Sequence, residues 1–91
     1  MLLLISYDLN GYERPSAYAA VKQFIERNAI SYRRPLYSQW LVETANDWNW
    51  WQAQLLKIMD SNDRLFICRV FSGTYQGYLD QDIWPWASAR M

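Results

Sequence analysis

The chain has 91 residues, of which 52% are hydrophobic, with nine Lys or Arg, nine Asp or Glu and no His. This length and composition predict one folded domain over residues 1–91 and argue against disorder. The lack of His excludes His-activated nucleophiles, His metal ligands and paired-His ribonuclease chemistry, and the balanced charge gives no general sign of a nucleic-acid partner. Cys68 is the single Cys, so an intramolecular disulfide is excluded.

Two further features bear on partners and location. Six Trp, seven Tyr and three Phe are more than a domain of this size normally buries alone, which favours an oligomer or a ligand surface. No segment has the length of a membrane helix, and "MLLLIS" is too short and lacks the charge of a signal peptide. We therefore expect a cytoplasmic protein with no membrane partner.

The first elements are a strand and a helix. Residues 2–5 are apolar on both faces, which predicts a central strand that is covered on both sides. Asp8 follows at its carboxyl end, and Asn10-Gly11 predicts a turn. Pro15 suits the first turn of a helix, and apolar residues at helical spacing predict that helix over residues 15–28.

The middle of the chain reads as extended, then helical, then extended. Residues 30–35 and 36–44 predict either a hairpin or one long bent strand. Thr44 to Asp47 is similar to a capping box, and the following periodicity predicts a helix from there to about residue 59. "RLFICRVF", residues 64–71, predicts a third strand that is largely apolar on both faces.

The C-terminal residues 72–91 form a Trp-rich extension of a core over residues 1–71. Ser72-Gly73 predicts a turn, residues 74–79 a short edge strand, and residues 80–89 a helical turn or two that docks Trp84 and Trp86. The whole order is that of an α+β, ferredoxin-like β-α-β-β-α-β sandwich, in which two helices cover one face of the sheet. Because the first and last core strands are apolar on both faces, either a second copy or the extension must cover the other face.

Asp8 allows two interpretations. Asp often ends a strand because its side chain caps the following turn. Alternatively, a symmetric dimer that stacks through the sheet can bring Asp8 together with its copy. Two carboxylates can then hold one Mg²⁺ or Mn²⁺ ion, which activates water or stabilises a transferring phosphate.

Other candidate residues surround this hypothesis. Arg33 and Arg34 are the only adjacent basic pair, and together with Arg14 they can bind a phosphate, or they are a solvated loop. Ser38 on an otherwise apolar strand face is explained equally well by close packing. Three tyrosines can stack on bases or are half-buried sheet residues: Tyr7, Tyr32 and Tyr37.

The segments "LLLISYDLN", "YSQWLVET" and "SNDRLFICRV", each separated by a predicted helix, resemble the small Cas-two family of CRISPR adaptation proteins. They resemble the bacterial SinR-like proteins more closely, and the toxin VapD belongs to the same superfamily. The Cas-two likeness covers about residues 2–71, and the SinR-like likeness extends through the Trp-containing extension. The chain departs from Cas-two proteins in its balanced charge and in this extension.

The resemblance implies a ferredoxin-like homodimer. It implies that Asp8 is the catalytic, metal-binding carboxylate, paired across the dimer, of a metal-dependent endonuclease acting on RNA or DNA. It also implies phosphate contact by Arg33 and Arg34, with Tyr7 and Ser38 close by. Since many members of the family are scaffolds, a non-catalytic dimeric module for protein or nucleic acid stays open as the alternative, and a nucleotide binder is a third reading.

Overall fold

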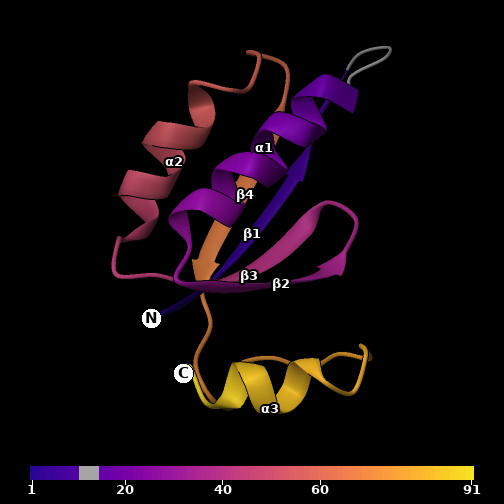
Figure 1. The fold of residues 1–91 in the computed structure, drawn as a ribbon, viewed down its shortest axis with the longest axis vertical. Helices are drawn as coiled ribbons and strands as arrows, with labels where there is room; N and C mark the ends of the chain where they lie inside the picture. Colours follow the sequence, from indigo (N-terminus) through magenta and orange to yellow (C-terminus); the bar gives the residue numbers. More distant parts are fainter. Residues whose placement is uncertain (11–14) are drawn as a thin grey trace.

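The computed structural model describes residues 1–10 and 15–91, which form an α+β domain with one four-stranded antiparallel sheet. The elements in chain order are β1 (Leu2–Asp8), α1 (Pro15–Asn28), β2 (Ser31–Leu36), β3 (Gln39–Glu43), α2 (Trp48–Leu56), β4 (Arg64–Arg69) and α3 (Ile83–Ser88). Figure 1 shows α1 and α2 on one side of the sheet and α3 apart from them, beside the C-terminus. Gly11 and Arg14 lie outside the described residues, so the expected turn and phosphate contact there are not placed.

The sheet has the order β2-β3-β1-β4, so β1 is central as predicted. It lies between β3 and β4, with Leu4 opposite Leu41 on one side and Cys68 on the other. Residues 31–43 form a hairpin, and the alternative of one long bent strand was wrong. The helix expected over residues 15–28 is confirmed as α1.

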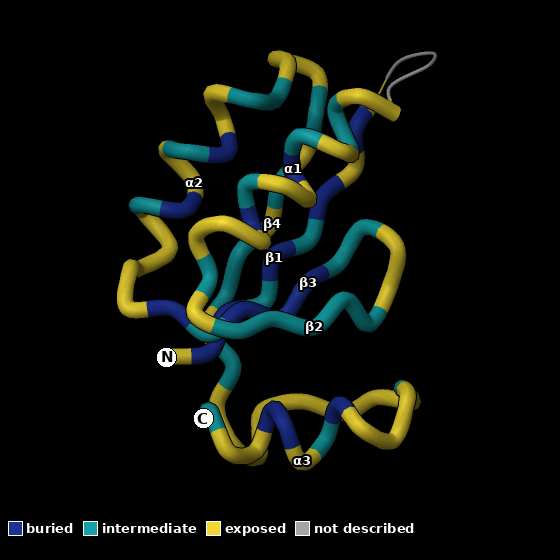
Figure 2. Tube along the Cα trace, viewed as in Figure 1, coloured by how far each residue is buried: buried dark blue, intermediate teal, exposed yellow. Residues whose placement is uncertain are grey.

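One face of the sheet carries the main core. Side chains alternate between the faces of a strand, so Leu3, Ile5 and Tyr7 point towards α1 and α2. Val21 and Ile25 of α1 meet them, as do Trp51 and Leu55 of α2. The dark blue segments in Figure 2 gather between these layers, which shows where the core lies.

The start and end of α2 differ from the prediction. Asp47, rather than Thr44, is the N-cap, because its carboxylate accepts a hydrogen bond from the Trp50 N–H at 3.0 Å. The Thr44 hydroxyl instead accepts from the Trp51 indole N–H at 3.0 Å inside the core. The α-helix ends at Leu56, and the remaining residues to Met59 continue as turns.

The second face of the sheet is covered by the C-terminal extension, one of the two candidates, but only at one end. Leu2 and Leu41 form a smaller cluster there with Ile83, Trp86 and Ala87. Towards the other end the face is open, and Phe66 of β4 is 63% exposed, so β4 is not covered on both sides as its sequence suggests.

Residues 74–79 do not form the expected edge strand. They cross the second face as an irregular segment, in which Leu79 packs against the smaller cluster and Tyr75 stacks on Trp84 at 6.0 Å between ring centroids. Side-chain packing on the face replaces backbone pairing at the sheet edge. The turn at Ser72-Gly73 is confirmed, and Gly73 has a φ of +82°.

Candidate functional site

Asp8 is the last residue of β1, and its side chain is exposed. Alternation along β1 puts it on the same face as Leu2 and Leu4, beyond the end that α3 covers. Its cross-strand neighbour on β4 is Arg64, which is also exposed. Among residues 1–10 and 15–91, no side chain makes a hydrogen bond or ion pair with the Asp8 carboxylate, so it is available to a ligand.

A second carboxylate lies in the loop before β4, but it is engaged. Asp63 accepts a hydrogen bond from the Asn10 backbone N–H at 2.9 Å and another from the Asp60 N–H at 2.8 Å. These bonds tie the segment after β1 to the loop between α2 and β4. Asp8 therefore differs from Asp63, whose oxygens hold the backbone in place.

The described residues of one chain offer a divalent ion at Asp8 few ligands. The described part of the chain contains no group of three or more His, Cys, Asp or Glu side chains placed to hold a metal. Mg²⁺ and Mn²⁺ prefer several oxygen ligands, and one carboxylate holds them weakly. A metal at Asp8 fits the chemistry of the donor where a further carboxylate or phosphate oxygens complete its oxygen shell.

Tyr7 serves the core. It is 5% exposed, and its hydroxyl accepts a hydrogen bond from the Trp40 indole N–H at 2.8 Å. Burial raises the pKa of this hydroxyl above its ordinary value, while the bond from Trp40 and the charge of Arg34 lower it less. The buried ring has no open face on which a base can stack.

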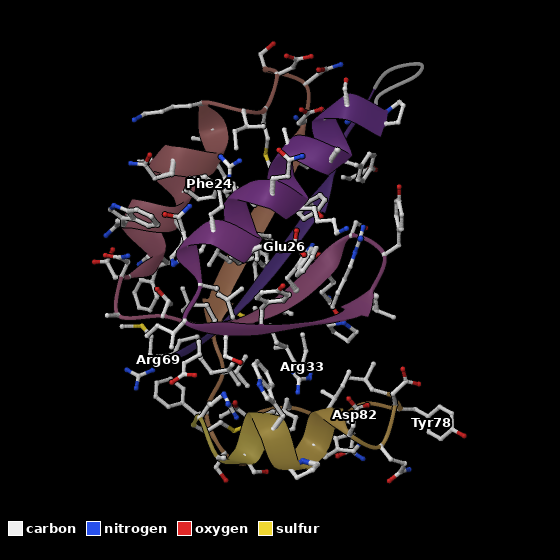
Figure 3. All side chains as sticks on the ribbon, viewed as in Figure 1. Phe24, Glu26, Arg33, Arg69, Tyr78 and Asp82 are labelled. Carbon is white, nitrogen blue, oxygen red and sulfur yellow. The ribbon has the colours of Figure 1, made fainter. Side chains whose placement is uncertain are left out.

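The two adjacent arginines point to opposite faces of the sheet, as neighbours on a strand must. The Arg33 guanidinium lies on the α3 side, 5.0 Å from the centre of the Trp86 ring and 3.8 Å from an Asp82 carboxylate oxygen. Figure 3 shows Arg33 reaching from β2 towards Asp82. Arg34 lies on the other face, 4.7 Å from the Tyr37 ring and 4.9 Å from the Trp40 ring.

Neither arginine joins Asp8 within one chain. Arg33 is in register with Leu41, and Leu41 with Leu4, which precedes Asp8 by about 13 Å along β1 at the usual rise per residue. Arg34 lies on the face of the sheet opposite to that of Asp8 and donates to the Tyr37 carbonyl oxygen at 2.8 Å. The structure does not bring the predicted phosphate-binding pair together.

Of the remaining candidates, Tyr37 and Ser38 lie at the β2–β3 turn and Tyr32 lies near the start of β2. The Ser38 carbonyl oxygen accepts a hydrogen bond from the Tyr7 N–H at 3.1 Å, so the turn lies beside the end of β1. Tyr37 is 68% exposed, and its ring centre is 5.2 Å from that of Tyr18 on α1. Tyr32 is half-buried against Trp40 and donates to Glu26 at 3.2 Å.

Sequence reasoning missed the contacts that hold the extension. Trp86 lies between two guanidinium groups, with Arg33 at 5.0 Å and Arg90 at 4.7 Å from its ring centre. Its indole N–H donates to the Ser31 hydroxyl at 2.9 Å, and Arg90 bonds Glu43 at 3.0 Å. The signal in the sequence was the Trp-rich composition, but nothing in it paired these residues.

Comparison with known proteins does not supply a family. A scan against models of protein families finds no match, and a search of curated proteins finds no relative at a significant level. None of the described helices is long and apolar enough to cross a membrane.

Proposed function

We propose that this chain is a cytoplasmic, Cas-two-like and SinR-like homodimer with a metal-dependent endonuclease site, of the ribonuclease type, at paired Asp8. The observation that carries the proposal is an exposed carboxylate at the end of the central strand, on the open part of the sheet, that bonds no side chain of residues 1–10 or 15–91. Element order and strand order support a ferredoxin-like core, with α3 as an addition.

The dimer would form on the open half of the second face. Phe66 is 63% exposed there, and Ser6 and Asp8 share this face of β1. An isologous contact puts each residue near its own copy when it lies close to the two-fold axis. Stacking two open halves would bury Phe66 and bring the two Asp8 carboxylates to one place.

A shared site resolves the shortage of ligands. Two Asp8 carboxylates and water can complete the oxygen shell that the described residues of one chain do not supply. A bound Mg²⁺ or Mn²⁺ ion would supply Lewis-acid activation of water and of the phosphoryl oxygen of an RNA or DNA backbone. The chain's own contribution is the rigid strand that aims Asp8 out of the sheet.

The alternative is a non-catalytic dimeric scaffold or binding module. It is favoured by the arginines, since Arg33 and Arg34 both stack on aromatic rings and hydrogen-bond backbone carbonyl oxygens of their own chain. Cations held in this way contribute less to phosphate binding. In that case Asp8 only ends its strand at the following turn and binds no metal.

Cleavage of labelled RNA and DNA with and without Mn²⁺ tests the proposal. We expect metal-dependent cleavage that Asp8→Ala reduces at least about 100-fold, because a metal ligand contributes several kcal/mol to the transition state. Asp80→Ala is the matched control, since Asp80 is an exposed carboxylate on the extension. Undiminished cleavage by Asp8→Ala, or none by a dimeric wild type, would contradict the nuclease and favour the scaffold.

A further inference from the structure

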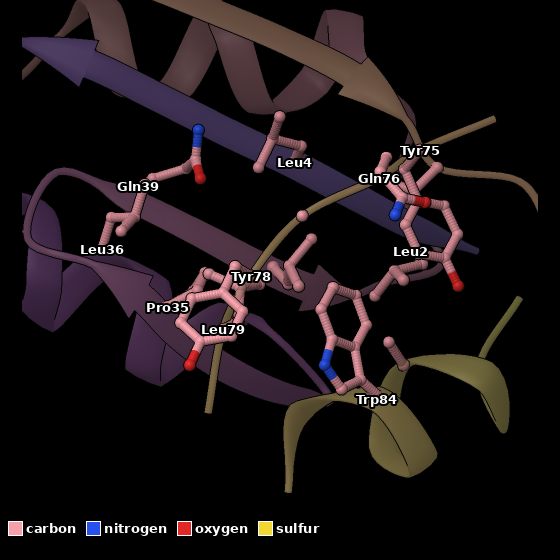
Figure 4. Close-up of a pocket in the computed structure, with 14 residues that line it drawn as sticks. Leu2, Leu4, Pro35, Leu36, Gln39, Tyr75, Gln76, Tyr78, Leu79 and Trp84 are labelled. Atoms are coloured by element: carbon pink, nitrogen blue, oxygen red, sulfur yellow. The ribbon is translucent and has the colours of Figure 1, made fainter. Parts of the chain in front are cut away.

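A groove of about 390 Å³ lies on the second face, at the end where the extension crosses it. Leu2, Leu4 and Leu41 of the sheet form its floor, and the segment 75–79 and Trp84 form its walls. Figure 4 shows Gln39 on one side and Gln76 with Tyr75 on the other, with Leu4 between them. This volume is within the range of small-molecule sites in proteins.

The lining of the groove disfavours a charged ligand. Among the described residues that line the groove, none is Asp, Glu, Lys or Arg, and most are aliphatic or aromatic. A charged ligand would lose its hydration in the groove without gaining a counter-charge, which is costly. A neutral, largely apolar ligand gains free energy from the same burial.

The aromatic walls of the groove favour a flat ligand. The rings of Tyr75 and Trp84 stack on each other, with 11° between their planes, and both residues line the groove. Tyr78 at the rim is 98% exposed and would be partly covered by a ligand. Flat aromatic surfaces pack well against a second flat ring system.

Two side-chain amides supply the polar contacts. Gln39 and Gln76 line the groove, and neither amide hydrogen-bonds another described residue. Each amide offers both a donor and an acceptor. Ligand sites typically combine apolar walls with a few polar groups of this kind, which fix the orientation of the ligand.

We propose that this groove binds a neutral aromatic small molecule that carries one or two hydrogen-bonding groups. The groove extends along the sheet face from Leu2 to Gln39, which pairs with Ser6 of β1, and Asp8 is not among its lining residues. Binding there requires neither the metal nor nuclease activity. It gives the Trp-rich extension a role beyond covering the sheet, since the extension builds two walls of the site.

A pair of fluorescent probes tests the proposal on the full chain. N-phenyl-1-naphthylamine is a neutral aromatic amine, and 8-anilinonaphthalene-1-sulfonate has the same rings plus one negative charge. We expect saturable fluorescence enhancement by the neutral probe at one site per chain and at least tenfold weaker binding of the sulfonate. Equal affinity for both probes, or no enhancement by the neutral one, would overturn the proposal.

A substitution locates the binding. Gln39→Glu is nearly isosteric and places a charge in the groove, so we expect it to weaken binding of the neutral probe at least tenfold. Gln23→Glu adds the same charge on the exposed surface of α1 and should leave binding unchanged. Circular dichroism checks that both variants fold, and an equal effect of the two variants would show that the probe binds elsewhere.

Discussion

The two faces of the sheet are covered in different ways. On the first face, α1 and α2 bury one continuous apolar core that includes the fully enclosed Trp51. On the second face, α3 covers one end and is held largely by Trp86 and its polar neighbours. The first face therefore carries most of the stability of the domain, and the second face is covered by α3 only at one end.

Replacing one buried Trp on each face should give the largest difference between the faces in the free energy of unfolding. Trp51→Ala should lower the free energy of unfolding by about 3–5 kcal/mol, as is usual for truncating a buried aromatic residue. Trp86→Ala should cost less and should release the extension, because the Trp86 ring packs in the smaller cluster, against two arginines and on the Ser31 hydroxyl, and not in the main core. Chemical denaturation measures the first effect, and amide hydrogen exchange measures the second.

In Trp86→Ala we expect faster exchange confined to residues 70–91, with exchange in α1 and β1 unchanged. Trp48→Ala is a control for both variants, because Trp48 is 48% exposed. If Trp86→Ala destabilised the whole domain as much as Trp51→Ala, the two faces would be energetically equivalent and the comparison would fail.

A smaller effect is expected from Tyr7→Phe on the first face. The Trp40 N–H loses its acceptor, and an unsatisfied buried donor costs about 1–3 kcal/mol. Because burial raises the pKa of Tyr7 above 10.0, the folded state holds this proton more tightly than the unfolded state. The stabilisation that comes from the protonated Tyr7 hydroxyl is complete below pH 10, and it is lost as the pH rises through the folded-state pKa of Tyr7.

Unfolding measured from pH 8 to pH 11 should therefore show a steeper loss of stability above pH 10 in the wild type than in Tyr7→Phe. Tyr78→Phe should follow the wild type, since Tyr78 is 98% exposed. Parallel curves for Tyr7→Phe and the wild type would mean that the hydroxyl titrates as if it were in solvent.

The same contrast between faces explains what the sequence could predict. The helix over residues 15–28 and the central strand follow from periodicity and from an apolar run, which are local properties. The cover of the second face depends on Trp86 meeting Arg33, which is distant in sequence, as well as Arg90 one helical turn later. Local patterns do not encode a contact between residues as far apart as Trp86 and Arg33. From the sequence, either a second copy or the extension could therefore have covered the second face.

One feature of the candidate site followed from the sequence without the structure. Once residues 30–35 are taken as extended, Arg33 and Arg34 are expected to point to opposite faces of the sheet, as they do. The position of Asp8 at the end of the central strand followed from the apolar run before it. The groove beside Gln39 could not be predicted, because the extension that forms its walls was expected to be an edge strand.

The central claim is that two chains share one metal ion through Asp8. The most direct test is a calorimetric titration of the wild-type protein with Mn²⁺, together with light scattering to measure the oligomeric state. We predict a dimer that binds one ion per two chains, and an Asp8→Asn variant that stays dimeric but loses this binding. A monomer, a dimer that binds no Mn²⁺, or binding that Asp8→Asn leaves unchanged would contradict the claim.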